Sequence, residues 1–337
     1  MKHAVIPWII AGAMVAYVYG LTYQAKNTLG FNPSYEFYDT TYVKVFIDGL
    51  GGPHEVFGEY NNILEGQKTL VEADSMASNE FLMSFAVNSP RPARLYINDE
   101  ALEVLLMPGD TSLSVNLHYS PLNRELDSLR YKGMLANICD YYLEKSEIFG
   151  DVHLRARRSI LVSEDLNGFG QQLDSMAIRE LNYLNEKEIF GDLPEWFVHF
   201  ERNEILYQKG YLKLAKAYNK EVPENYLDQL NVNNQDAMFS YYYYLYLQNY
   251  FSRALLQGKN NQAGQEEENL RQVLELASKD LKDGPHDVFI TRQIFSQLKN
   301  ATNSDFAHEL FDLYEEKFNS KKYMRFLKTQ LEKEEEV

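Results

Sequence analysis

The spacing of apolar residues changes near residue 130, and this change limits the possible folds more than any other feature of the sequence. Before it, short apolar segments alternate with polar residues and end at turn residues; after it, apolar residues recur every three or four positions over longer segments. A period of two is typical of strands, and a period near 3.6 is typical of helices. We therefore expect an α+β chain, with an antiparallel β domain over residues 31–130 and a helical domain with an acidic C-terminal tail over residues 131–337.

The first region contains six candidate strands separated by turn signals. The turns include Gly49 to Pro53, Asn88 to Pro90, and Pro108-Gly109-Asp110, in which proline followed by glycine fits a type II turn. The expected strands are 43–47, 68–72, 81–87, 93–97, 102–107 and 112–117. Short strands at this spacing indicate an antiparallel sandwich or an open barrel.

Arg91 and Arg94 are close together in this β region. Two interpretations fit them. They could bind an anion, or they could be solvated charges on an edge strand that discourage aggregation, and the second interpretation is favoured.

The second region reads as consecutive helices that form a bundle or a solenoid-like stack. The clearest helix follows Gly191 to Pro194, with Asp192 as its expected N-cap and Pro194 in its first turn. One face of this helix carries a continuous, mostly aromatic stripe of Trp196, Phe200, Tyr207, Tyr211, Leu214 and Tyr218. Asp283-Gly284-Pro285 is expected to end a later helix over residues 266–283.

The run from Tyr241 to Tyr246 is the least common local feature. Four adjacent tyrosines cannot share one face of a helix, so some of them face the core and others face solvent or a partner. Packing in the core, with the hydroxyls hydrogen-bonded at its edges, is one interpretation, and docking of a partner is the other. The candidate partner-binding residues are Trp196, Phe200, Tyr241, Tyr242, Tyr243, Tyr244 and Tyr246.

Residues 4–25 carry no charge and lie between Lys2 and Lys26. As a helix, the apolar part of this segment would span roughly 30 Å, about one bilayer core. A cleaved signal peptide, with Val18 and Gly20 before the cleavage site, and a retained membrane anchor over residues 4–23 fit equally well, and a buried segment of a soluble protein is a third alternative. In the first two cases Lys2 stays in the cytoplasm, and we expect the chain on the periplasmic side of the cell envelope.

Motifs that carry chemistry are few. The net charge of −16 argues against nucleic-acid binding, and a single cysteine, Cys139, excludes an internal disulfide and a CxxC pair. We expect Cys139 to be a buried structural thiol, although a redox role between molecules is an alternative. Glu195 and His199 could form two ligands of a metal site but would need a third from elsewhere. The sequence therefore predicts no catalytic, metal-binding or cofactor-binding residue.

Several segments in order resemble a known family. They are EADSMASNEFLMSFAVNSPRPARLYIND from Glu72, LEVLLMPGDTSLSVNL, and YKGMLANICDYYLE with Gly133 and Asn137 in a G-x-x-x-N element. Together with later segments, up to about residue 333, they are similar to the N-terminal half of TlpA-like thiol-disulfide oxidoreductases of Bacteroidota. The resemblance implies a small β domain with a turn at Pro108-Gly109-Asp110, followed by helices and an envelope location.

This family continues into a thioredoxin domain with a W-C-x-x-C centre, whereas this sequence has no CxxC and reaches Val337 where that domain would begin. Thioredoxin exchange needs an attacking and a resolving thiol, so we expect the thioredoxin domain and its activity to be absent. The expected function is a non-catalytic envelope module that binds a ligand or a protein partner, such as a separate oxidoreductase or a membrane complex. An enzyme with scattered site residues and a structural subunit of a membrane complex remain alternatives.

Overall fold

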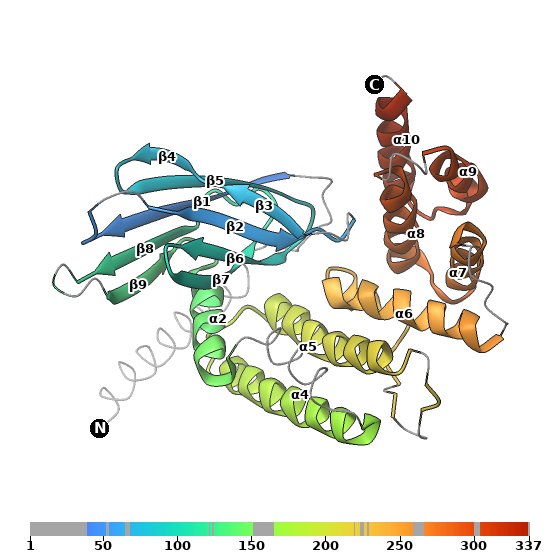
Figure 1. The fold of residues 1–337 in the computed structure, drawn as a ribbon, viewed down its shortest axis with the longest axis horizontal. Coiled ribbons are helices and arrows are strands. Elements are labelled where there is room, and N and C mark those ends of the chain that lie inside the picture. The colour runs from blue at the N-terminus through green and yellow to red at the C-terminus, as the bar shows by residue number, and fades with distance from the viewer. Residues whose placement is uncertain are drawn as a thin grey trace, which may run out of the picture.

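The structure is a computed structural model that describes residues 39–335, except 52–53, 65–67, 121, 123–124, 151–164, 219, 223–225, 228, 259–265 and 300–303. The predicted signal or anchor segment, residues 1–25, lies outside the described residues. Within the part of the chain that is described, no helix is both long and apolar enough to span a membrane. The α+β class is confirmed, with strands over residues 39–132 followed by helices (Figure 1).

In the described part of the chain, nine strands form two sheets. One sheet has the order β4-β5-β1-β8-β9 and the other has the order β3-β2-β6-β7. The strands are β1 Asp39–Asp48, β2 Val56–Asn61, β3 Lys68–Glu72, β4 Asp74–Ala77, β5 Glu80–Val87, β6 Arg91–Ile97, β7 Glu100–Leu106, β8 Ser114–Tyr119 and β9 Leu126–Lys132. The inward residues of both sheets share one apolar core, so the arrangement is a sandwich. The alternation of side chains along each strand places apolar residues in this core. In β1, for example, Val43, Val45 and Ile47 are buried, and Lys44 is exposed.

The structure differs from the expected strand plan in two ways. It adds β2, β4 and β9, whose sequences lack a clear strand pattern. For example, β2 contains Gly58, and the side chains of β4 are all exposed. Gly58 is required where it lies, because a Cβ atom there would come within 2.7 Å of the Phe85 ring across the sandwich. The second difference is that β1 and β8 pair in parallel, because the chain passes through the second sheet before β8 returns beside β1.

The turn at Pro108-Gly109-Asp110 has the expected geometry. Gly109 has a φ of 75°, and the N–H of Asp110 donates to the carbonyl of Met107 at 3.0 Å. A type II turn places its third residue in this positive-φ region, which favours glycine.

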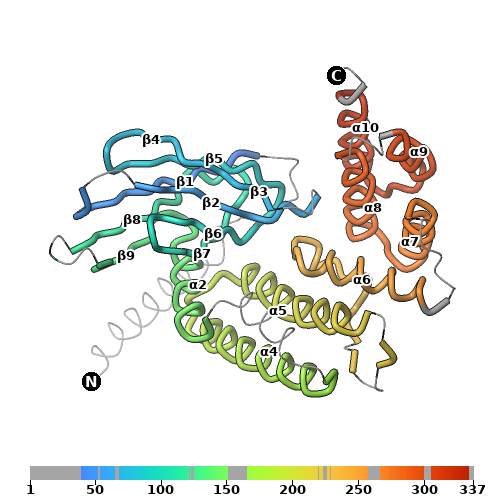
Figure 2. Tube along the Cα trace, in the orientation of Figure 1, coloured from blue at the N-terminus to red at the C-terminus, as the bar shows by residue number. Residues whose placement is uncertain are grey.

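Helices follow the sandwich, and most of them pack against the next helix in the chain (Figure 2). They are α2 Ala136–Phe149, α4 Leu166–Ile189, α5 Glu195–Lys216, α6 Tyr241–Gly258, α7 Glu266–Asp280, α8 Asp283–Leu298, α9 Ser304–Tyr314 and α10 Lys321–Glu335, with short 3-10 turns at Gln235–Ala237 and Glu315–Lys317. The prediction that Asp283 to Pro285 ends a helix is wrong. These residues begin α8, where a proline in the first turn sacrifices no helical hydrogen bond.

The N-cap prediction for α5 is also wrong. Pro194, not Asp192, occupies the N-cap position, and no side chain there caps the helix. By contrast, the N-terminus of α4 is capped by a side chain, because Asp165 accepts hydrogen bonds from the N–H groups of Asn167 and Gly168.

Replacing Asp165 with alanine is therefore expected to lower the free energy of unfolding by about 1 kcal/mol, the usual cost of losing an N-cap. Asp192→Ala is the matched control, and we expect a change below about 0.5 kcal/mol. Denaturant unfolding measures both values. Equal losses in the two variants would contradict this assignment of the caps.

The sandwich and the helices are joined by an inserted loop and two arginines. Ile63 and Leu64, which follow β2, are fully buried in the helical core. Arg292 of α8 donates to the carbonyl of Ile63 at 2.8 Å, and Arg91 of β6 donates to the carbonyl of Phe239, just before α6. These contacts fix the outer face of the four-stranded sheet opposite α2, α5 and α6.

Candidate ligand-binding cleft

A cleft of about 540 Å³ lies between the four-stranded sheet and the helices α2, α5 and α6. One wall comes from β2, β3, β6 and β7, and the other from the three helices. Figure 1 shows α2 descending from the sandwich below β7, with α5 to its right and α6 beyond α5. The volume lies within the range of small-molecule sites.

The sheet wall carries a row of alternating charges. Strand register places Arg94 directly opposite Glu59 on one side and Glu103 on the other. Glu59 also accepts hydrogen bonds from Lys68 at 2.8 Å and from the hydroxyl of Tyr96 at 3.0 Å. Burial alone would raise the pKa of Glu59, but these hydrogen bonds and the charges of Lys68 and Arg94 lower it, so this carboxylate is held ionised.

The solvated-edge interpretation of Arg91 and Arg94 is wrong, because β6 is an internal strand of its sheet. Arg91 is 1% exposed and donates to Ser89 and to the carbonyl of Phe239. Both arginines line the cleft.

The helix wall contains a buried ion cluster that joins three helices. The ammonium of Lys145 on α2 lies 2.5 Å from Glu201 on α5 and 3.1 Å from Glu180 on α4. The hydroxyls of Tyr141 and Tyr142 donate to the two oxygens of Glu201 at 3.4 and 3.3 Å. Both oxygens of Glu201 therefore already have hydrogen-bond donors.

Glu204, one helical turn beyond Glu201, differs from it in hydrogen bonding. It is 7% exposed and lines the cleft, and its Oε1 atom is buried without a hydrogen-bond partner. Burial raises the pKa of Glu204 to about 7, against the opposing effects of a hydrogen bond from Ser240 and the charge of Arg91. At neutral pH this carboxyl can therefore gain or lose a proton.

The predicted partner-binding residues divide by exposure. Phe200, Tyr243, Tyr244 and Tyr246 are buried, so they offer a partner no exposed side chain. The hydroxyls of Tyr243 and Tyr244 donate to the carbonyls of Val232 and Met238, as the core-packing interpretation predicts.

Trp196, Tyr241 and Tyr242 are partly exposed, and both tyrosines line the cleft. A binding role for these three residues stays a prediction. Trp196 does not line the cleft but packs edge-on against the Phe197 ring beside it on α5.

Sequence reasoning missed Lys145, Glu201 and Glu204 as site residues. A signal was present, since Glu201 and Glu204 lie three residues apart on α5 among Phe197, Phe200 and other buried apolar residues. Acids on the apolar face of a helix need partners in the core, and this requirement could have identified them.

Two other candidates from the sequence are located away from the cleft. Cys139 is buried in the sandwich core, and burial raises the pKa of its thiol to about 12, which disfavours a reactive thiolate. Glu195 and His199 lie 3.8 Å apart on an exposed face of α5. In the described residues, no three potential metal ligands come together.

Comparisons with known proteins give no further guide to function. No model of a protein family matches the chain, and no curated protein matches it significantly.

Proposed function

We propose that the chain is a non-catalytic binding module and that the cleft between its sandwich and its helices receives the ligand. The observation that carries this proposal is the cleft itself, whose opposite walls come from two different parts of the chain. Sites at such junctions are common for small molecules and peptides. Its walls combine tyrosines with charged groups, which suit a polar ligand rather than a lipid.

The proposed location is the periplasmic side of the cell envelope, with an envelope protein or a membrane complex as a further partner. The uncharged segment 4–25 and the resemblance to the platform half of TlpA-like proteins support it. The intact mass of the native protein, recovered from separate cell fractions, tests this location. The mass shows whether the segment is removed, and the fraction shows whether the chain is bound to the membrane. Recovery of the unprocessed chain from the cytoplasm would contradict it.

An enzyme is the second candidate, and Glu204 is the observation that favours it. A carboxyl with a pKa of about 7 suits a general acid or base. Binding is the better supported function, because the oxygens of the neighbouring Glu201 are taken by Lys145 and two tyrosines. A second carboxylate ready to act with Glu204 is therefore lacking on this helix wall.

A cleft-filling variant tests the binding function. Ala101 is exposed on β7 and lines the cleft, so Ala101→Trp is expected to fill part of it. Amino acids, dipeptides, neutral sugars and dicarboxylates are tested for an increase in the thermal unfolding midpoint. We expect at least one class to raise the midpoint of the unmodified chain by about 2 °C or more.

The same compounds should leave the midpoint of Ala101→Trp unchanged. The control is Ala77→Trp, an exposed position on β4 in the other sheet. A panel in which no compound shifts the unmodified chain would contradict the proposal, as would a shift that Ala101→Trp retains.

A further inference from the structure

The most informative group in the cleft is the carboxylate of Glu204. Ser240 and the backbone N–H of Tyr241 hydrogen-bond to this carboxylate, yet its Oε1 atom is buried without a partner. A buried acceptor without a donor is costly and uncommon in folded proteins. Because Glu204 lines the cleft, a ligand group that reaches this oxygen can supply the missing donor.

The charges of the walls decide which donor fits. The ammonium of Lys68 pairs with Glu59, and the ammonium of Lys145 pairs with Glu180 and Glu201. Arg94 lies in register between Glu59 and Glu103. Arg91 acts on Glu204 through its charge but leaves Oε1 without a hydrogen bond, so Glu204 is the buried carboxylate of the walls to which a positively charged donor adds most.

The rings around the cleft also suit a cation. Tyr142, Tyr241 and Tyr242 line the helix wall, and the faces of tyrosine rings attract cations. One ring already does so, because the guanidinium of Arg292 lies 5.6 Å from the centre of the Tyr241 ring.

We propose that the cleft binds a ligand through a primary ammonium group, such as the side chain of a lysine residue, with Glu204 Oε1 as the acceptor. The inference rests on the proposed binding function and names the chemistry that the site recognises. The ammonium donates to Oε1, and its alkyl stem packs against the tyrosines of the helix wall.

The pH dependence of binding follows from the environment of Glu204. The charged and titratable side chains around Glu204 include Arg91, Glu103, Lys145, Glu180, Glu201, Tyr241 and Tyr242, and Glu59, Lys68 and Arg94 line the opposite wall. Because burial raises the pKa of Glu204 to about 7, the carboxylate is mostly protonated at pH 6 and mostly ionised at pH 8. An alkylammonium stays charged over this range, so the affinity is expected to rise about tenfold from pH 6 to pH 8.

The experiment uses the full chain and two probes that differ in one group. Nα-acetyl-lysine amide carries the ammonium, and Nα-acetyl-norleucine amide has a similar alkyl side chain without it. Isothermal titration at pH 8 is expected to show binding of the lysine probe at least tenfold tighter than that of the norleucine probe. Equal affinities, or no binding of the lysine probe, would overturn the inference without the need for any variant.

Glu204→Gln keeps the shape of the side chain but replaces the charged carboxylate with a neutral amide. We expect at least a tenfold loss of affinity for the lysine probe. Glu195→Gln, an exposed position on the same helix, is the control and should bind like the unmodified chain. Glu204→Gln is also expected to raise the thermal midpoint above pH 7, where the ionised carboxylate is buried, which separates lost recognition from lost folding. Unchanged affinity in Glu204→Gln would overturn the inference.

Failure of this inference differs from failure of the proposed function. If a neutral or anionic compound binds and Ala101→Trp blocks it, the cleft is a binding site and the ammonium assignment is wrong. If no compound binds at all, both are wrong.

Discussion

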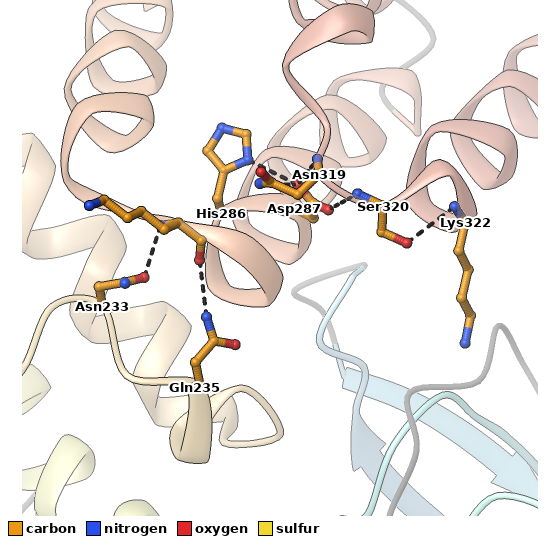
Figure 3. A network of polar contacts seen from close by, with 8 residues as sticks. Asn233, Gln235, His286, Asp287, Asn319, Ser320 and Lys322 are labelled. Atoms are coloured by element: carbon orange, nitrogen blue, oxygen red, sulfur yellow. Dashed lines mark hydrogen bonds and ion pairs between the residues drawn. The ribbon is translucent and has the colours of Figure 1, made fainter.

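Asp287→Ala is expected to lower the free energy of unfolding by about 3 to 5 kcal/mol. Asp287 lies in the buried N-terminal part of α8 and is 0% exposed. Its carboxylate accepts hydrogen bonds from the backbone N–H groups of Asn319 and Ser320, at 3.0 and 2.7 Å, and from the side chain of Asn319 at 3.2 Å (Figure 3). Nδ1 of His286 lies 3.0 Å from the same carboxylate.

These contacts hold the turn that leads into α10, where Ser320 in turn accepts from the N–H of Lys322. Alanine would leave the partly buried donors of Asn319 and Ser320 without their acceptor, and each hydrogen bond to a charged group is worth about 1.5 to 3 kcal/mol. Asp287→Asn should also be destabilising, because an amide has one acceptor oxygen instead of two.

Urea unfolding measures the loss, and Asp312→Ala, an exposed acid on the neighbouring α9, is the matched control. We expect a change below about 0.5 kcal/mol for that control. Similar losses in Asp287→Ala and Asp312→Ala would mean that the network of Figure 3 does not stabilise the helical stack.

The fold class could be predicted from the sequence because periodicity reports burial directly. The segment 81–87 is an example, since Phe81, Met83, Phe85 and Val87 all face the core of the sandwich. The strands that were missed lack this signal: β4 buries no side chain, and β9 buries Tyr131 alone. The parallel pairing of β1 with β8 could not be predicted either, because it depends on the order of strands in space.

The cleft could not be predicted because its residues come from distant parts of the chain. Glu59 and Glu204 are far apart in sequence, and only the packing of helices on the sheet brings them to one cavity. The composition of the run from Tyr241 to Tyr246 indicated a possible binding surface, yet Tyr243 and Tyr244 are buried in the core. Composition identifies unusual residues, but exposure decides which of them can bind.

Lys145→Met is the second variant with a large expected effect, a loss of about 3 to 5 kcal/mol at pH 7. Its ammonium is the cation between Glu180 and Glu201, which are 3% and 2% exposed. Burial alone would lower the pKa of Lys145, but the charges of Glu201 and Glu180 and the hydrogen bond with Glu201 raise it well above the usual 10.5. The stabilisation is therefore complete below pH 10.5 and is lost only as the pH rises through the higher value of the folded state.

Methionine keeps the length of the side chain but leaves two buried carboxylates without their cation, and this is the reason for the large loss. Adding Glu201→Met to Lys145→Met removes one of these charges, and we expect it to restore about 1 to 2 kcal/mol. Lys187→Met is the matched control, because Lys187 pairs with Glu144 at the surface and such pairs contribute about 1 kcal/mol or less. Urea unfolding of all four proteins decides the outcome: if Lys145→Met costs no more than Lys187→Met, the ion cluster does not hold α2, α4 and α5 together, and the helix wall of the cleft depends on apolar packing instead.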